Sequence, residues 1–438
     1  MKTVHAPEQS IPPQPEATTQ PSESWGGRVV RRIGVFVSER VPASARVWRS
    51  LVARRAPLMR IAPLLVVAAA MLALAYVRYH EQKFYITPGL AGFADINTLA
   101  AKRLGIPNYG LVGNPIGYDG QFFFFMAYKP SFIWTCAHAS VYCPALEPSF
   151  RWQRILYPAF ARALALGHTP WIPFTLLLVN FIGVLVVVYL VGKMAVEMGA
   201  SRWMGAAVGL FCGELLGFLR DLADPFGVLW IVVAIYLLRR NRPLWAAVAG
   251  AAAILTREQL VFYLPILALP LLAQRRWLTL LETAAITLIP FVAWQATLHA
   301  LYGNWPFFAG DTQVATLTRF PFLGLWRTRH DYDFGVTLLC AGIPLAFAVV
   351  VSLAAIWHHG PRSLLRDPVP LMALVYCVLF SLVNYLQWAD VWGAARLEDP
   401  GVVLAALAAC ALPWRSLRVS YGVVLALTAF APFIEFVR

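Results

Sequence analysis

The sequence predicts an all-α fold, a polytopic bundle of about eleven transmembrane helices, within a range of 10–13. Of its 438 residues, 59% are hydrophobic and only 13% are charged, and the mean hydropathy is +0.63. Soluble domains are about a quarter charged. Apolar runs long enough to cross a bilayer recur along the chain, with arginines between them. Together these observations indicate a multi-pass membrane protein.

The clearest runs are predicted to span the membrane. They are residues 61–77, 171–192, 203–219, 222–238, 277–298, 336–357, 369–386, 401–412 and 421–437. The runs 244–255 and 260–273 are each too short to span upright, and Thr256-Arg-Glu-Gln259 separates them. They predict either a thin helical hairpin with its polar tip near the outer face or helices embedded in protein. Residues 155–166 predict an interfacial helix or half a span, because Arg162 interrupts them.

The basic residues indicate the orientation of these spans. The short predicted outer loops carry only Arg220, Arg257 and Arg396. The predicted inner loops carry Lys193, Arg202, Arg239, Arg240, Arg242, Arg275, Arg276, Arg362, Arg366, Arg415 and Arg418. This positive-inside bias predicts a cytoplasmic N-terminus. The net charge of +14 is therefore interpreted as a topology signal, and no nucleic acid partner is expected.

The composition divides the chain into three parts. Residues 1–27 are rich in Pro, Ser, Gln, Glu and Thr and predict a disordered cytoplasmic tail. Residues 28–60 form a basic juxtamembrane segment, and residues 61–438 form the transmembrane domain. That domain includes a large first external loop, 78–154, and a second one, 299–335.

The six cysteines do not form a disulfide framework in a chain of this length. Cys136 and Cys143 lie together in the first loop. They form one bridge if that loop faces an oxidising compartment. The others fall in apolar runs and are expected to be core thiols: Cys212, Cys340, Cys377 and Cys410.

Acidic residues gather on the predicted outer side, which we take as a sign that the polar chemistry lies there. This group comprises Asp221, Asp224, Glu258, Asp390, Glu398 and Asp399, with Asp119 in the first loop. Asp119 stands where a turn containing Gly117 and Gly120 meets an apolar helical segment. Its carboxylate either caps that helix or takes part in chemistry.

Three motifs carry a resemblance to a known class. Tyr118-Asp-Gly-Gln-Phe-Phe-Phe-Phe-Met-Ala127 resembles the Asp-Gly-Gln-Phe-Tyr-Tyr-x-x-Ala element of bacterial polytopic glycosyltransferase-like proteins. Arg151-Trp-Gln-Arg-Ile-Leu-Tyr-Pro158 resembles the Arg-x-Gln-Arg-Ile-Leu-Tyr-Pro element that follows the first element in those proteins. Leu255-Thr-Arg-Glu258 is similar to their Leu-[ST]-Arg-Glu tip. In order, they resemble the GT-C class of membrane glycosyltransferases over roughly residues 60–275. This chain departs from the pattern by having Phe where the class often has Tyr after Gln121.

The resemblance implies that Asp119 is the catalytic carboxylate. Transfer from a lipid phosphosugar to a hydroxyl needs a base near the acceptor proton and positive charge near the departing phosphate. The predicted substrate-binding residues are Tyr118, Gln121, Arg151, Arg154, Asp221, Asp224, Arg257, Glu258 and Arg396.

Two of these assignments have alternatives. Asp221 and Asp224 are candidate ligands for a divalent cation, Mg²⁺ or Mn²⁺, or else cap a helix before Pro225. Arg257 and Glu258 either line the site or form an ion pair with each other at the tip.

We therefore expect an enzyme that moves a sugar from a polyprenyl-phosphate donor to an envelope or cell-surface glycan or lipid acceptor. The transfer would take place on the outer face of the inner membrane. One alternative is a transporter or lipid flippase. Another is a non-catalytic component of a cell-surface polymer assembly complex. A cavity shared by Asp119, Asp221 or Asp224 and an arginine favours the enzyme, and a passage through the midplane favours transport.

Overall fold

A computed structural model describes residues 43–80, 89–97, 101–102, 105–106, 117–138, 148–308 and 317–433. The chain divides into two units, Met1–Met59 and Arg60–Arg438. The predicted disordered tail 1–27 lies outside the described residues, as does most of the basic segment 28–60. The second unit contains all described residues from Arg60 onwards.

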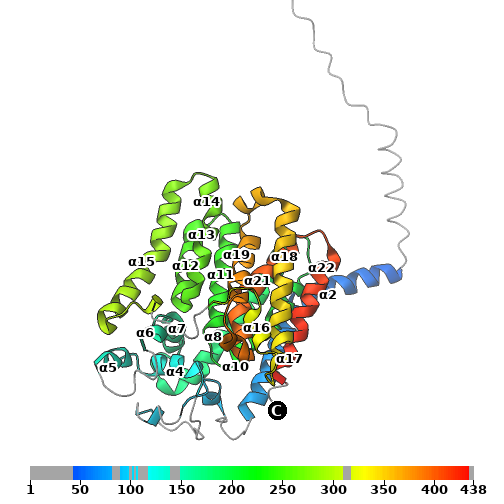
Figure 1. Cartoon of the computed structure of the whole chain (residues 1–438). Helices are drawn as coiled ribbons and strands as arrows, with labels where there is room; N and C mark the ends of the chain where they lie inside the picture. Colours follow the sequence, from blue (N-terminus) through cyan, green and yellow to red (C-terminus); the bar gives the residue numbers. More distant parts are fainter. Residues whose placement is uncertain are drawn as a thin grey trace, which may run out of the picture. The chain divides into compact units, whose positions relative to one another are not determined.

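The described residues form helices and no β-strand, as expected for an all-α protein; the only strand-like pairing among them is an isolated bridge between Leu317 and Val383. The longer helices are α2 (Ala43–His80), α8 (Ile172–Glu197), α11 (Asp224–Arg239), α12 (Pro243–Thr256), α15 (Trp277–Tyr302), α18 (Ile343–His359), α19 (Val369–Ser381), α21 (Val391–Ala411) and α22 (Arg415–Leu427). Figure 1 shows most of them side by side in one bundle.

Shorter elements connect and cover this bundle. They are η1 (Leu90–Gly92), α4 (Gly120–Tyr128), α5 (Phe132–His138), α6 (Pro148–Trp152), α7 (Leu156–Leu164), η3 (Thr169–Trp171), α9 (Trp203–Gly209), α10 (Cys212–Leu219), η4 (Glu258–Tyr263), α13 (Leu264–Leu267), α14 (Leu269–Ala273), η5 (Pro306–Phe308), α16 (Leu323–Arg327), α17 (Phe334–Thr337), η6 (Leu338–Gly342), η7 (Pro361–Leu365), α20 (Tyr385–Ala389) and η8 (Thr428–Phe430).

Five helical stretches of the described chain are long and apolar enough to cross a membrane. They are Arg60–His80, Thr169–Glu197, Trp277–Tyr302, Phe334–His359 and Arg415–Phe433. Three shorter apolar stretches accompany them: Pro243–Thr256, Glu258–Ala273 and Val369–Ser381. These helices fit a multi-pass membrane protein, while the count of about eleven spans stays a prediction.

The surface of α15 supports a bilayer environment. Only 11% of its most apolar window is buried in the protein, and Leu278, Leu281 and Ile289 are more than half exposed. A continuous apolar surface of this kind is unfavourable in water and favourable against lipid. By contrast, 56% of the window in α8 is buried, so α8 lies closer to the centre of the bundle.

Several predicted spans are interrupted. The run 203–219 forms two helices, α9 and α10, because the chain bends at Leu210 and Phe211. The run 369–386 ends as a helix at Ser381. A new helix begins after Asn384, whose side chain accepts a hydrogen bond from the Leu386 amide at 3.0 Å.

Helix α21 begins ten residues before the predicted span 401–412. Asp390 caps its N-terminus, accepting hydrogen bonds from the amides of Trp392 and Gly393. The helix then continues through Pro400, where the sequence alone suggests a break. Neighbouring helices bury almost all of α21, and this packing stabilises a helix whose backbone hydrogen bonding the proline interrupts. As a result, Arg396 is carried on a buried helix instead of an outer turn.

The short runs around residues 244–273 break where the sequence predicts. Helix α12 ends at Thr256, and Arg257 has an extended backbone (φ −150°, ψ 109°) before η4, α13 and α14 follow. Residues 155–166 contribute α7, whose nine residues cover about 14 Å, too little to span.

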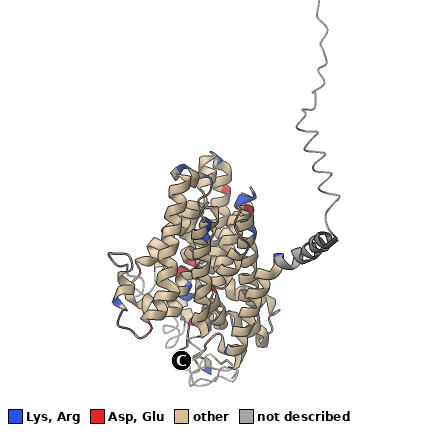
Figure 2. Cartoon of the chain, turned by 90° about the vertical axis from the view of Figure 1, so that its right-hand side faces the viewer, with Lys and Arg blue, Asp and Glu red and all other residues tan. Residues whose placement is uncertain are grey.

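The helical bundle has two opposite ends. The end that carries α4 and α5 is the α4 end, and the opposite end, which carries α14, is the α14 end (Figure 1). Figure 2 shows Lys and Arg at the α14 end and charged residues of both signs inside the bundle.

Candidate functional site

The turn that holds Asp119 is fixed by close backbone packing. Gly117 takes a positive φ of 69°, and the Tyr118 amide donates to the Asp95 carbonyl at 2.9 Å. A Cβ atom on Gly120 would lie 2.2 Å from the Arg220 carbonyl oxygen, so this position requires glycine. The Gln121 Oε1 atom accepts from the Asn97 amide at 3.1 Å. The Tyr-Asp-Gly-Gln motif thus has a clear structural role: it positions Asp119.

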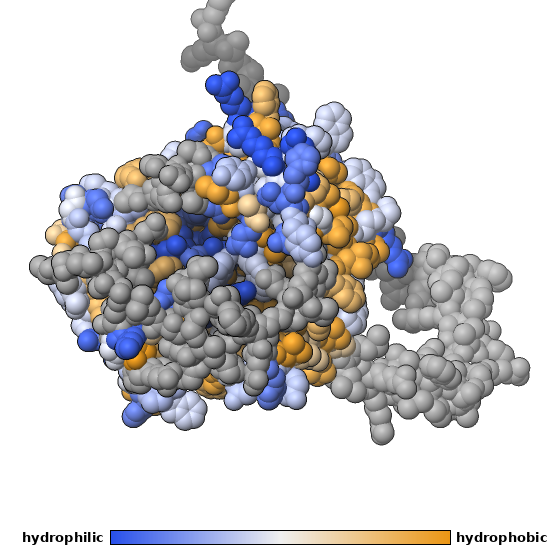
Figure 3. Space-filling view, turned by 60° about the horizontal axis from the view of Figure 1, so that its bottom comes forward, coloured by the Kyte–Doolittle hydropathy of each residue, from blue (hydrophilic) through white to orange (hydrophobic). Residues whose placement is uncertain are grey.

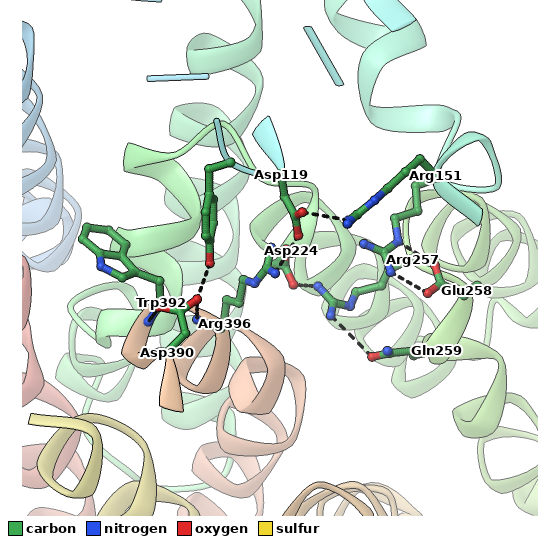
Figure 4. A network of polar contacts seen from close by, with 12 residues as sticks. Asp119, Arg151, Asp224, Arg257, Glu258, Gln259, Asp390, Trp392 and Arg396 are labelled. Carbon is green, nitrogen blue, oxygen red and sulfur yellow. Dashed lines mark hydrogen bonds and ion pairs between the residues drawn. The ribbon is translucent and has the colours of Figure 1, made fainter. Parts of the chain in front are cut away.

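The Asp119 carboxylate lies between two guanidinium groups, as Figure 4 shows in part. Its Oδ1 is 2.8 Å from Nη1 of Arg151, and its Oδ2 is 2.6 Å from Nη2 of Arg396. Asp119 occupies the N-cap position of α4 but makes no capping hydrogen bond through its side chain. The helix-capping alternative is therefore wrong for this residue.

Burial and charge act on Asp119 in opposite directions. Burial raises the pKa of its carboxyl, but the guanidiniums of Arg396 and Arg151 outweigh that effect and hold the pKa below its usual value. The side chains of the three residues are 13–18% exposed. At neutral pH, Asp119 is thus an ionised group at the accessible edge of the bundle interior, and each of its carboxylate oxygens is paired with an arginine.

Deeper in the bundle lie two further ion pairs from the predicted site. Arg154 binds Glu258 in a forked geometry, with Nε–Oε2 at 2.8 Å and Nη2–Oε1 at 2.7 Å. Arg257 pairs with Asp224 (Figure 4). All four side chains are at most 7% exposed. Arg257 therefore pairs with Asp224 and Glu258 pairs with Arg154. The alternative in which Arg257 and Glu258 form an ion pair with each other is wrong.

The guanidiniums are also held by aromatic rings. The Arg151 guanidinium lies 4.4 Å from the centre of the Phe122 ring, and Arg154 lies 5.0 Å from that of Phe150. The Tyr118 ring has two guanidiniums nearby, those of Arg220 and Arg396, each at 5.3 Å. A desolvated cation gains about 2 kcal/mol from such contacts, so the rings help to fix the arginines.

Tyr118 connects the turn to α21. Its hydroxyl donates to Oδ2 of Asp390 at 2.8 Å. Burial raises the pKa of this phenol well above its usual value, and the nearby carboxylates of Asp390 and Asp119 add to the effect while Arg396 opposes it. The phenol therefore stays protonated and serves as a hydrogen-bond donor.

Sequence reasoning did not include three members of this network in the site. Arg220 pairs with Asp95 and covers the Trp392 ring at 4.3 Å, and Asp390 receives the Tyr118 hydroxyl. Two signals were available: Arg220 lies in a predicted outer loop next to an acidic pair, and Asp390 belongs to the acidic residues predicted for the outer side. Among the described residues, the network contains five arginines, Arg151, Arg154, Arg220, Arg257 and Arg396, and five carboxylates, Asp95, Asp119, Asp224, Glu258 and Asp390.

The acidic pair Asp221 and Asp224 is divided between two surroundings. Asp224 is the first residue of α11, where its carboxylate pairs with Arg257 instead of capping the helix. Asp221 has a left-handed backbone (φ 48°), and the positive charge of Arg78 acts on its buried carboxyl. No group of three or more metal-ligating side chains forms within the described part of the chain. Two carboxylates that face separate arginines do not fit a shared cation, so no step is derived through a metal.

Three other carboxyl groups lie deeper. Glu214 on α10 and Glu398 and Asp399 on α21 are fully buried, and none of their oxygens has a hydrogen-bond partner among the described residues. Glu282, by contrast, is exposed on α15.

Figure 3 shows hydrophilic residues in a recess at the α4 end of the bundle, flanked by hydrophobic surface. Cys136, in α5 at this end, takes part in a disulfide, while Cys143 lies outside the described residues. The four cysteines of the apolar helices are free and buried, as expected.

Comparison with protein-family models, curated proteins and solved structures finds no match. The resemblance of the three motifs to the GT-C class therefore stays a prediction. The geometry of the arginine–carboxylate network is the basis for interpreting the site.

Proposed function

We propose that this protein is a membrane glycosyltransferase of GT-C type that transfers a sugar from a polyprenyl phosphate to an envelope glycan or lipid. One observation carries the proposal: the Asp119 carboxylate is held by Arg151 and Arg396 at the accessible edge of a network whose deeper pairs are sealed. The proposal includes about eleven spans, a cytoplasmic N-terminus and a site on the outer face of the inner membrane.

The two guanidiniums offer a binding site for the donor phosphate. A guanidinium donates two parallel N–H groups to either a carboxylate or a phosphate. A phosphate can therefore take the place of the Asp119 oxygens on Arg151 and Arg396. The polyprenyl chain would lie between the apolar helices, in contact with lipid. Arg154 and Arg257 are more deeply buried, each in a pair with its own carboxylate, so they position the site and do not need to bind the donor directly.

This exchange would turn Asp119 into a base. In the resting protein its pKa is lowered, so it is a poor proton acceptor. When the guanidiniums turn to the phosphate, the effect of burial remains and raises the pKa of the carboxyl. Asp119 would then be a competent base only when a donor is bound.

Asp119, Arg151 and Arg396 are sufficient to account for every bond, proton and charge in the transfer step. The oxygen of the acceptor hydroxyl bonds to the anomeric carbon of the donor sugar, and the bond from that carbon to the phosphate oxygen breaks. The acceptor proton passes to the Asp119 carboxylate. Polyprenyl phosphate leaves with the bonding electrons, and Arg151 and Arg396 stabilise its charge. A divalent cation, for which Asp221 and Asp224 were the candidate ligands, is not needed for this balance.

The test measures transfer of labelled sugar by the purified protein from a panel of polyprenyl-phosphate monosaccharides, with a membrane extract as the source of acceptors. We expect Asp119→Asn to lower the rate by about 10²–10⁴-fold, the usual contribution of a general base. Asp331→Asn is the matched control, because Asp331 is exposed and lies outside the network.

Two results would count against the proposal in different ways. Equal rates for wild type and Asp119→Asn would remove Asp119 from the mechanism. If wild type transferred no sugar from any lipid donor, the enzyme assignment would fail. Movement of intact donor across a liposome bilayer, without transfer, would then support the transporter or flippase alternative.

A further inference from the structure

A second cluster of arginines surrounds an open cavity at the α14 end. The cavity has a volume of about 500 Å³ and lies where the ends of α11 and α14 meet the segment before α19. Its polar lining includes Arg239, Arg276 and Arg366, together with Asn241 and Gln274. The Asp119 network lies towards the other end of the bundle, so this cavity is a separate feature (Figure 1).

An apolar groove continues from this cavity along the side of the bundle. The groove has a volume of about 240 Å³ and lies between α12, α13 and α15. Its lining is almost wholly apolar and includes Ala284 and Leu288, which are exposed on α15. Four residues line both the groove and the cavity: Leu238, Pro243, Leu267 and Leu271. The basic cavity and the apolar groove are therefore contiguous.

The charges of the cavity are not balanced. Asp367 is the one carboxylate in its lining, and its Oδ2 pairs with Nη2 of Arg239 at 2.6 Å. Arg276 donates to Oδ1 of Asn241 at 3.2 Å. Among the described residues, Arg366 has neither an ion pair nor a side-chain hydrogen bond. Three guanidiniums with one carboxylate leave the cavity two positive charges in excess.

We propose that this cavity and groove bind an anionic phospholipid from the surrounding bilayer leaflet. The phosphate headgroup would be bound by Arg276 and Arg366, and one acyl chain would lie along Ala284 and Leu288. A soluble anion would use the cavity but would gain nothing from the groove. A zwitterionic lipid would fill the groove but would leave the excess positive charge uncompensated. Basic pockets between helices are known to suit anionic headgroups in this way.

The test uses the purified full-length protein after exchange into lipid-free detergent. Binding of dioleoyl phosphatidylglycerol and of dioleoyl phosphatidylcholine is measured by native mass spectrometry and by the rise in melting temperature. We expect wild type to bind phosphatidylglycerol at least tenfold more tightly than phosphatidylcholine. The double variant Arg276→Gln/Arg366→Gln should lose about tenfold in that affinity, because two charged hydrogen-bond donors are removed.

Two matched controls separate the headgroup from the chain. Arg362→Gln/Arg415→Gln removes two arginines predicted for the same side, neither of which lines the cavity, and should leave the affinity unchanged. Ala284→Trp fills the groove and should weaken phosphatidylglycerol binding, whereas Ala285→Trp, on the next exposed position of α15, should not.

Three results would overturn the proposal. Equal losses in the two double arginine variants would indicate unspecific attraction between charges. A rise in melting temperature with inorganic phosphate equal to that with phosphatidylglycerol would indicate a soluble anion site. Unchanged lipid affinity in Ala284→Trp would show that no acyl chain occupies the groove. None of these results depends on glycosyltransferase activity.

Discussion

The two ends of this bundle use arginine in opposite ways. At the α4 end every network arginine has a carboxylate partner, and its side chain is at most 18% exposed. At the α14 end the cavity has three arginines and one carboxylate, Asp367, which pairs with Arg239; the side chains of this pair are 25% (Arg239) and 41% (Asp367) exposed. A buried guanidinium without a partner costs several kcal/mol, whereas an exposed one remains solvated.

This difference determines how each end can bind an anion. At the α4 end an incoming phosphate must exchange with a carboxylate that is already bound, so binding changes the state of Asp119. At the α14 end an anion simply adds to an excess of positive charge. We therefore expect coupling between binding and protonation at the first end and plain electrostatic attraction at the second.

The largest expected effect is the loss of stability when a buried ion pair is broken, compared with the loss of a partly exposed pair at the other end. Arg154→Met leaves Glu258 charged and buried, and should lower the free energy of unfolding by about 3–5 kcal/mol. Arg239→Met removes a partly exposed pair and should cost about 0–1 kcal/mol. Both are measured by denaturant unfolding in the same detergent micelles.

The double variant Arg154→Met/Glu258→Leu provides the control for this comparison. Replacing both charges by apolar groups removes the unpaired carboxylate, so most of the lost stability should return. If Arg239→Met proved as costly as Arg154→Met, the distinction between a buried and an exposed end would be lost.

A smaller effect is expected from the turn that fixes Asp119. Gly120→Ala forces a Cβ atom against the Arg220 carbonyl, and should cost about 1–3 kcal/mol through overpacking. Gly335→Ala is the control, because no atom lies within 4 Å of its Cβ position and its φ is not positive. Melting temperatures of the two variants should differ by several degrees. Equal values would show that the turn can move away from Arg220.

The smallest effect concerns acid pH. The pKa of Asp119 is lowered in the folded protein, whereas an unfolded aspartate titrates near about 3.9. The folded state therefore binds fewer protons, and the stabilisation from Asp119 is complete above the unfolded pKa. It is lost as the pH falls through the folded pKa.

Unfolding free energies at several pH values test this expectation. The difference between wild type and Asp119→Asn should be constant from pH 5 to 7 and should shrink below about pH 4. A difference that does not change with pH would show that the carboxylate does not make its ion pairs in solution.

The sequence predicted the helical class and most members of the α4-end network. Apolar runs and the break at Thr256-Arg-Glu-Gln259 are local properties, and the structure has both. The three motifs likewise indicated Asp119, Arg151, Arg154 and Arg257, which the network contains. Motif residues can be identified from the sequence because they are close together along the chain.

Only the tertiary structure decided which charges pair. The Tyr118–Asp390 hydrogen bond joins residues 272 positions apart, and the Arg154–Glu258 pair joins residues 104 positions apart. The local pattern around Asp119 fits a helix cap as well as an arginine-bound carboxylate, and the sequence could not choose between them. The choice depends on α21, which continues through Pro400 and carries Arg396 to the site. Helix packing determines that approach, and no local pattern encodes it.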